Sequence, residues 1–137
     1  MRQGWIALIL GTLMALSSGI AALAQDAEIK ETIDSQFEAF KADDFDTAFG
    51  YATPQLRFLF QSPQNFERMV TQGYPMVHRP AEVRYLELRE VAGNLWQKVQ
   101  ITDAKGFMHL LDYKMEETEE GWRIGAVQIL GNPGVTA

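Results

Sequence analysis

The hydrophobic periodicity of this chain changes once, at Pro80, from the repeat of an α-helix to that of a β-strand. Before that proline, apolar side chains recur every three or four residues, as in Ile29, Ile33, Phe37 and Phe40, which places them on one face of a helix. After it, apolar and polar residues alternate, as in a strand with one buried face. A helical half followed by a strand half predicts an α+β domain.

Four helical segments are expected before Pro80. The stripe that begins at Ile29 predicts a first helix that ends near Ala42, and Asp43-Asp44 reads as the cap of a second. Thr53-Pro54 and Ser62-Pro63 start a short turn and a further helix, because a capping hydroxyl before a proline favours a helix start. Segment 74–80 is expected to be a rigid connector, stiffened by its two prolines.

Four strands are expected after Pro80, at roughly 82–91, 95–102, 107–118 and 122–130. The breaks between them are short and contain glycine, which is typical of antiparallel hairpins. The simplest closure packs the N-terminal helices on one face of a curved, four-stranded antiparallel sheet. Curvature would open a cleft between helices and sheet, where a ligand would bind.

The first 24 residues have the three parts of a cleavable export signal. Arg2 is basic, the stretch from Gly4 to Ala24 carries no charge, and the segment ends in Ala22-Leu23-Ala24. We therefore predict a signal peptide over 1–24, cleavage after Ala24 and a periplasmic or secreted chain. The alternative is an uncleaved membrane anchor, because the uncharged stretch is about the length that spans a bilayer.

Residues 25–137 would then form one domain, which is long enough to bury a core without staples. The chain has no cysteine and two histidines, so we expect no disulfide, no metal site and no cofactor. Without Arg2 there remain 11 basic and 18 acidic residues, a net charge of −7. A negative surface repels phosphate backbones and anionic lipids, so nucleic acid is not an expected partner, and a membrane only if the signal is uncleaved.

Three strings of this chain are distinctive: Ala39–Asp44, then Ser62-Pro63 with Phe66, Met69-Val70 and Gly73-Tyr74-Pro75, and last Gly121–Ile124. Together they resemble a bacterial family known only as domain of unknown function 4864. More widely, helices followed by a strongly bent antiparallel sheet resemble the cone-shaped nuclear-transport-factor-like superfamily, which includes ketosteroid isomerase. The resemblance implies export and this fold, and it implies no assigned activity.

The strand over 107–118 carries the two candidate catalytic residues. Phe107, His109, Leu111, Tyr113 and Met115 share the more apolar face, which should point inward and place His109 and Tyr113 on the concave side. A histidine there would suit general acid–base work, whereas a single structural hydrogen bond would also satisfy it.

Two neighbouring residues bear on that chemistry. Gln97 would lie on the inner face of the preceding strand, where it would orient a ligand or pair with Tyr113. Asp112 falls on the outer face, so no inward carboxylate would face the His/Tyr pair. Ketosteroid-isomerase-like chemistry needs such a base, and its absence speaks against that activity.

The segment 74–80 is the second concentration of polar side chains. If it rims the mouth of the cleft, Tyr74, His78 and Arg79 would contact an anionic ligand. The alternative is a structural connector with a solvated arginine.

These residues favour a non-catalytic module that binds a small apolar molecule or a protein partner. Trp96, Met108 and Leu110 lie on the outer face of the predicted sheet, where a second copy of the chain would cover them in a homodimer. The alternatives are a hydratase or isomerase that uses His109 and Tyr113, and a lipid-facing accessory held at the inner membrane by an uncleaved signal.

Overall fold

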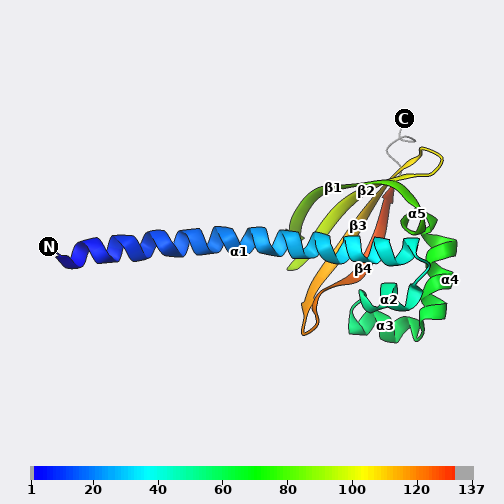
Figure 1. The fold of residues 1–137 in the computed structure, drawn as a ribbon, viewed down its shortest axis with the longest axis horizontal. Helices are drawn as coiled ribbons and strands as arrows, with labels where there is room; N and C mark the ends of the chain where they lie inside the picture. Colours follow the sequence, from blue (N-terminus) through cyan, green and yellow to red (C-terminus); the bar gives the residue numbers. More distant parts are fainter. Residues whose placement is uncertain (1, 132–137) are drawn as a thin grey trace.

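The computed structural model describes the backbone of residues 2–131 and the side chains of residues 19–131. In this part of the chain the helices precede the strands, and the strands form one antiparallel sheet in the order β1-β2-β3-β4 (Figure 1). The predicted α+β architecture is confirmed. The elements are α1 (Arg2–Lys41), α2 (Phe45–Gly50), α3 (Pro54–Phe60), α4 (Pro63–Gly73), α5 (Pro75–His78), β1 (Pro80–Val91), β2 (Asn94–Asp103), β3 (Met108–Thr118) and β4 (Gly121–Gly131).

Side-chain caps start the short helices as the sequence predicts. Asp44 accepts a hydrogen bond from the backbone N–H of Thr47 at the start of α2. The hydroxyls of Thr53 and Ser62 do the same for α3 and α4, each with a proline in the first turn. These caps satisfy backbone donors that a helix start leaves without partners.

The connector 74–80 differs from its prediction because it contains a helical turn, α5. Pro75 suits the first position of a helix, since its fixed φ is already helical and it has no N–H to satisfy. The turn is held in place by Met76 and Val77, which are buried in the core. Arg79, the residue before Pro80, ends the turn with φ −136° and ψ 65°, outside the helical region that a following proline disfavours.

Tight turns and bulges shape the sheet. Ala92 and Gly93 both have positive φ in the two-residue β1–β2 turn, the geometry that matches the twist of a hairpin. The β1–β2 register shifts between Tyr85 and Leu88, and the β3–β4 register shifts at Gly125. Such bulges bend a strand, and the sheet curves around α1 (Figure 1).

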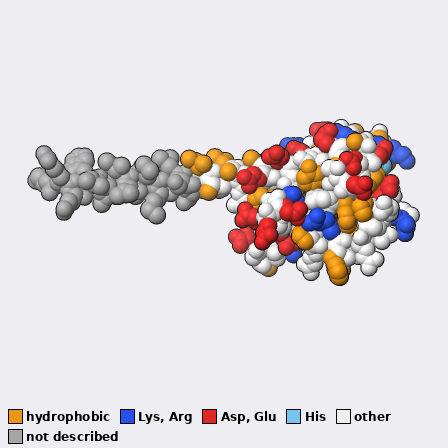
Figure 2. Space-filling view, turned by 60° about the horizontal axis from the view of Figure 1, so that its bottom comes forward, with side chains coloured by type: hydrophobic (Ala, Val, Ile, Leu, Met, Phe, Trp, Pro, Cys, Tyr) orange, Lys and Arg blue, Asp and Glu red, His pale blue; other side chains and the backbone are white. Residues whose placement is uncertain are grey.

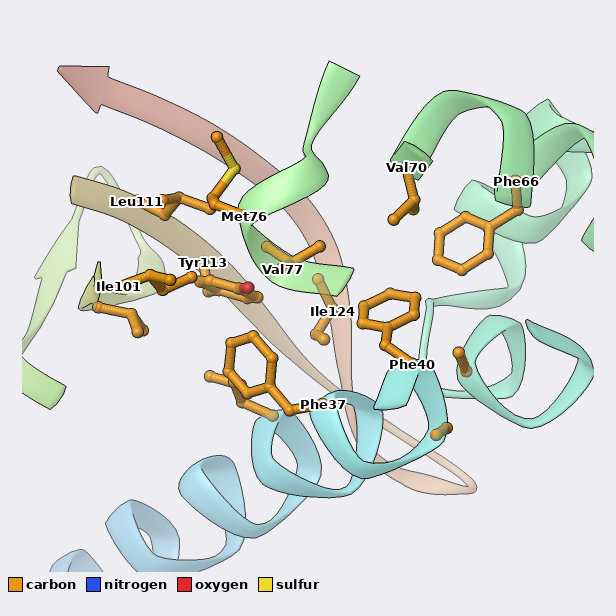
Figure 3. Packing of buried hydrophobic residues seen from close by; sticks show 14 of the residues in the cluster. Phe37, Phe40, Phe66, Val70, Met76, Val77, Ile101, Leu111, Tyr113 and Ile124 are labelled. Atoms are coloured by element: carbon orange, nitrogen blue, oxygen red, sulfur yellow. The ribbon is translucent and has the colours of Figure 1, made fainter. Parts of the chain in front are cut away.

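The core lies between α1 and the concave face of the sheet. Ile29, Ile33, Phe37 and Phe40 are all buried, so the predicted helical stripe is confirmed. Figure 3 shows two of these residues opposite side chains from β2, β3 and β4. The buried sheet residues of this cluster are Val99, Ile101, Leu111, Tyr113, Met115 and Ile124.

The predicted face of β3 is confirmed for its central residues. Leu111, Tyr113 and Met115 point to the core, and Asp112 lies on the outer face. The prediction is wrong for Phe107, which is exposed because β3 begins one residue later and Phe107 belongs to the turn.

Helix α1 continues across the predicted cleavage position after Ala24. Residues 19–24 are all exposed, with Ile20 and Leu23 at 66% and 73%, and burial of the apolar stripe begins at Ile29. In Figure 2 this part of α1 extends from the domain with hydrophobic side chains on its surface. The side chains of residues 1–18 of the predicted signal peptide lie outside the described residues. Where side chains are described, no helix has the length and apolar character to cross a membrane.

Candidate ligand cavity

A cavity of about 330 Å³ lies between the helices and the last two strands. Its lining is almost entirely apolar, and Gln36, Tyr74 and Tyr113 contribute the only polar side chains among the lining residues. A volume near 300 Å³ is at the lower end of the range for small-molecule sites. The lining residues are Gln36, Phe40, Ala52, Leu56, Phe60, Phe66, Met69, Val70, Tyr74, Val77, Tyr113, Ile124, Gly125, Ala126 and Val127.

The cavity has a buried floor and a partly exposed rim. Phe40, Val70, Val77 and Ile124 come from four different elements and are almost fully buried, and Figure 3 shows them converging. The rim consists of half-buried residues of α3, α4 and β4, among them Phe60. The cavity therefore opens between these helices and the edge strand β4.

Backbone hydrogen bonds hold the helical layer against β4 at one end of the cavity. The N–H of Thr53 donates to the carbonyl of Ile124 at 2.9 Å, and the N–H of Ile124 donates to the carbonyl of Tyr51 at 2.9 Å. This short parallel bridge fixes the start of α3 relative to the sheet. The opening beside it is thus a defined feature of the fold.

Tyr113 places a hydroxyl at the buried floor of the cavity. Its side chain is 1% exposed, and its ring packs edge-on against Phe37 with 6.4 Å between centroids. The hydroxyl forms no hydrogen bond with any residue that the structure describes. Burial raises the pKa of Tyr113, and the nearby Tyr74 raises this pKa further, so the phenol is a neutral hydrogen-bond donor at neutral pH.

The other two polar side chains of the lining are partly engaged. The hydroxyl of Tyr74 donates to the carbonyl of Val127 at 3.0 Å. The Nε2 of Gln36 donates to the carbonyl of Ala48 at 3.1 Å, whereas its Oε1 accepts no hydrogen bond within the described part of the chain. One carbonyl acceptor on Gln36 therefore remains available.

His109 does not share the cavity with Tyr113, although both lie on the inner face of β3. The Nε2 of His109 contacts Oδ2 of Asp103 at 2.9 Å, at the hairpin between β2 and β3. The pKa of Asp103 is lowered, first by this hydrogen bond and then by backbone N–H donors of the turn. The predicted His/Tyr pair is therefore not assembled in one pocket, and the cavity lining contains no histidine and no carboxylate.

Gln97 is fully buried, and its side chain forms hydrogen bonds with backbone carbonyls of the sheet. Its Nε2 donates to the carbonyls of Leu86 and Lys98 at 3.0 and 2.9 Å, where the β1 bulge leaves Leu86 out of the ladder. It forms no hydrogen bond with the Tyr113 hydroxyl, and it does not line the cavity. The buried amide compensates for the polar groups that a bulge exposes.

His78 and Arg79 meet at Asp43, and none of the three residues lines the cavity. The Nε2 of His78 lies 2.7 Å from the Asp43 carboxylate, and Arg79 donates to both carboxylate oxygens. Arg79 also donates to the carbonyl of Phe40 in the last turn of α1, at 2.9 Å. These side chains join the end of α1 to α5, and their bonds lower the pKa of Asp43, His78 having the largest effect.

Most of the cavity lining could not be recognised in the sequence. Gln36 had a visible signal, because it is a polar residue within the buried stripe of α1, between Ile33 and Phe40. Leu56 and Phe60 are four residues apart and read only as a helix face. Over the residues whose side chains are described, no group of three His, Cys, Asp or Glu is arranged to hold a metal ion.

Comparison with known proteins found one matching family model and a similar solved structure. A family model described as "Domain of unknown function (DUF4864)" matches residues 22–137. No curated protein matches the chain. A solved structure of the phospholipid-binding protein from Ralstonia solanacearum, in complex with a phospholipid, is similar, with 17% sequence identity, 77% of each chain covered and a TM-score of 0.51. At this identity the similarity shows a shared fold, and it is compatible with a nuclear-transport-factor-like cone.

Proposed function

The chain belongs to the family described as domain of unknown function 4864. We propose that it is a non-catalytic module that binds a small, mainly apolar molecule with a single alkyl chain. The observation that carries this proposal is the apolar cavity of about 330 Å³ with its opening between α3, α4 and β4. The proposal gains support from the similar fold of the Ralstonia solanacearum protein, whose structure contains a phospholipid.

The size and lining of the cavity favour one chain rather than a whole lipid. A volume of 330 Å³ is close to the minimum of small-molecule sites, so a second chain or a headgroup would have to remain outside. Each methylene of the ligand that is buried against an apolar wall improves the binding free energy by about 0.8 kcal/mol, which is roughly a fourfold gain in affinity. Binding would therefore depend on chain length.

The polar groups of the cavity support binding over catalysis. Hydratase and isomerase reactions need a positioned base, and neither a carboxylate nor a histidine lines this cavity. His109, the base of the enzymatic alternative, contacts Asp103 instead. No observation favours the enzyme hypothesis over the binding hypothesis.

A series of n-alkanols from hexanol to dodecanol tests the proposal. NMR titration would follow the methyl signals of Val70 and Ile124, which lie at the buried floor. We expect the dissociation constant to fall about fourfold per methylene until the cavity is full, and then to stay constant. An absence of chain-length dependence would contradict the proposal.

Two valine variants provide a matched pair for this titration. Val70→Phe places a larger side chain in the cavity, so we expect a loss of about tenfold in affinity for the longer alkanols, equal to one or two excluded methylenes. Val91→Phe makes the same chemical change at an exposed position at the end of β1 and should leave binding unchanged. Equal effects of the two variants would mean that the alkanols bind elsewhere.

We also propose that the domain is exported and that the folded unit begins close to Gln25. The exposure of residues 19–24 supports this, because removing them would uncover no core residue. Mass spectrometry of the exported chain tests the proposal: an N-terminus at Gln25 is expected, and an intact Met1 would indicate an anchor.

Homodimerisation through the outer sheet face stays a prediction. Met108 is 38% exposed there, and Trp96 and Leu110 are half-buried. Sedimentation at micromolar concentration tests it, since a monomer throughout the range would contradict it.

A further inference from the structure

The floor of the cavity carries hydrogen-bonding groups that a purely apolar ligand would leave without partners. We propose that the ligand enters with a neutral oxygen-containing group that accepts a hydrogen bond from Tyr113, so that the ligand class is a neutral amphiphile such as an alcohol, ketone or ester. This inference rests on the proposed function and specifies its ligand.

The Tyr113 hydroxyl supports this ligand class because it is a donor without an acceptor among the described residues. Buried polar groups in folded proteins almost always have a hydrogen-bond partner, and a buried tyrosine hydroxyl usually finds one. Tyr113 is 1% exposed and lines the cavity, and within the described residues its hydroxyl has none. An acceptor supplied by the ligand would complete it.

The lining of the same cavity also offers hydrogen-bond acceptors. The Oε1 of Gln36 is unused among the described residues, and Gln36 lines the same cavity. The Tyr74 hydroxyl donates its hydrogen bond to the carbonyl of Val127, and its oxygen lone pairs can still accept one. A ligand hydroxyl, which both accepts and donates, would suit this set better than a carbonyl.

The cavity lining also restricts the charge of the ligand. No Lys, Arg or His lines the cavity, so a carboxylate or phosphate placed there would lose its water without gaining a cation. Arg57, which follows the rim residue Leu56 in the chain, is paired with Glu120 at 2.6 Å. The buried end of the ligand should therefore be neutral.

Three probes of equal chain length separate these ideas: 1-octanol, 1-chlorooctane and octanoate at pH 8. Wild-type protein and the variant Tyr113→Phe are titrated with each, with methyl NMR as the readout. Tyr51→Phe is the matched control, because Tyr51 loses the same hydroxyl and does not line this cavity. Thermal unfolding followed by circular dichroism checks that Tyr113→Phe folds, which we expect because its hydroxyl bonds to no described residue.

We expect wild-type protein to bind octanol more tightly than chlorooctane, and octanoate most weakly. Tyr113→Phe should weaken octanol binding about three- to tenfold, the effect of one hydrogen bond, and leave chlorooctane binding unchanged. Equal octanol affinity in wild type and Tyr113→Phe overturns the inference, as does octanoate binding more tightly than octanol. In both cases alkyl-chain binding itself survives. If none of the three probes binds, the proposed function fails as well.

Discussion

The ion pair between Arg89 and Asp112 gives the sharpest test of how the sheet is stabilised. Asp112 lies on the outer face of β3, yet its side chain is only 6% exposed, and Arg89 of β1 covers it with a side chain that is 29% exposed. The Nη1 of Arg89 donates to Oδ1 of Asp112 at 2.8 Å, and Nη2 donates to Oδ2. The pair spans strand β2 and joins β1 to β3.

Removing one partner should cost more than removing both. Arg89→Met leaves a buried carboxylate without its cation. For a fully buried pair, this loss lowers the free energy of unfolding by about 3–5 kcal/mol. We expect a loss of about 2–3 kcal/mol here because Arg89 is partly exposed. Asp112→Leu leaves an arginine that can turn to water, so its cost should be about 1 kcal/mol. The double variant should return to within about 1 kcal/mol of wild type, since an apolar pair of similar volume replaces a buried ion pair well.

Urea unfolding of the four proteins measures this cycle, with the free energy of unfolding in water as the readout. The expected coupling energy between the two positions is about 2–4 kcal/mol. Lys41→Met is the control, because Lys41 pairs with the exposed Glu38 at the end of α1 and should contribute less than about 1 kcal/mol. If the losses of the two single variants simply add in the double variant, the reasoning about a buried charge is refuted.

Two further predictions concern the core and the response to acid. Val70→Phe should change the free energy of unfolding by less than about 1 kcal/mol, because the cavity accepts the ring. Val99→Phe, at a fully packed site, should cost about 1–3 kcal/mol or more. Chemical denaturation would compare the two variants, and equal costs would contradict an open cavity. Hydrogen bonds from His78 and other donors lower the pKa of Asp43. The contribution of Asp43 to the free energy of unfolding is therefore complete above about pH 5, and it is lost as the pH falls below about 4, through the lowered pKa. Asp43→Asn should therefore be less stable than wild type at pH 7 and lose less stability between pH 5 and pH 2, as urea midpoints across this range would show; parallel pH profiles would argue against it.

Local signals predicted the elements of this fold well. Hydrophobic spacing identified the α1 stripe and the alternation of the strands, and Thr53-Pro54 marked a helix start that the structure has at that position. These features depend on contacts between residues close in the chain, which a sequence displays directly. The turn at Pro75 was missed because its helical conformation depends on the burial of Met76 and Val77 in a core formed by distant segments.

The sequence by itself determined which face of β3 is inward, because a period of two assigns Leu111, Tyr113 and Met115 to one side. It could not determine what lies opposite each of these side chains. Tyr113 and His109 are equivalent in the pattern, and the tertiary structure separates them: a cavity lies over Tyr113, while Asp103 binds His109 at the hairpin. The physical reason is that periodicity reports only the direction of a side chain, whereas its partners depend on where α1, α3, α4 and α5 cross the sheet.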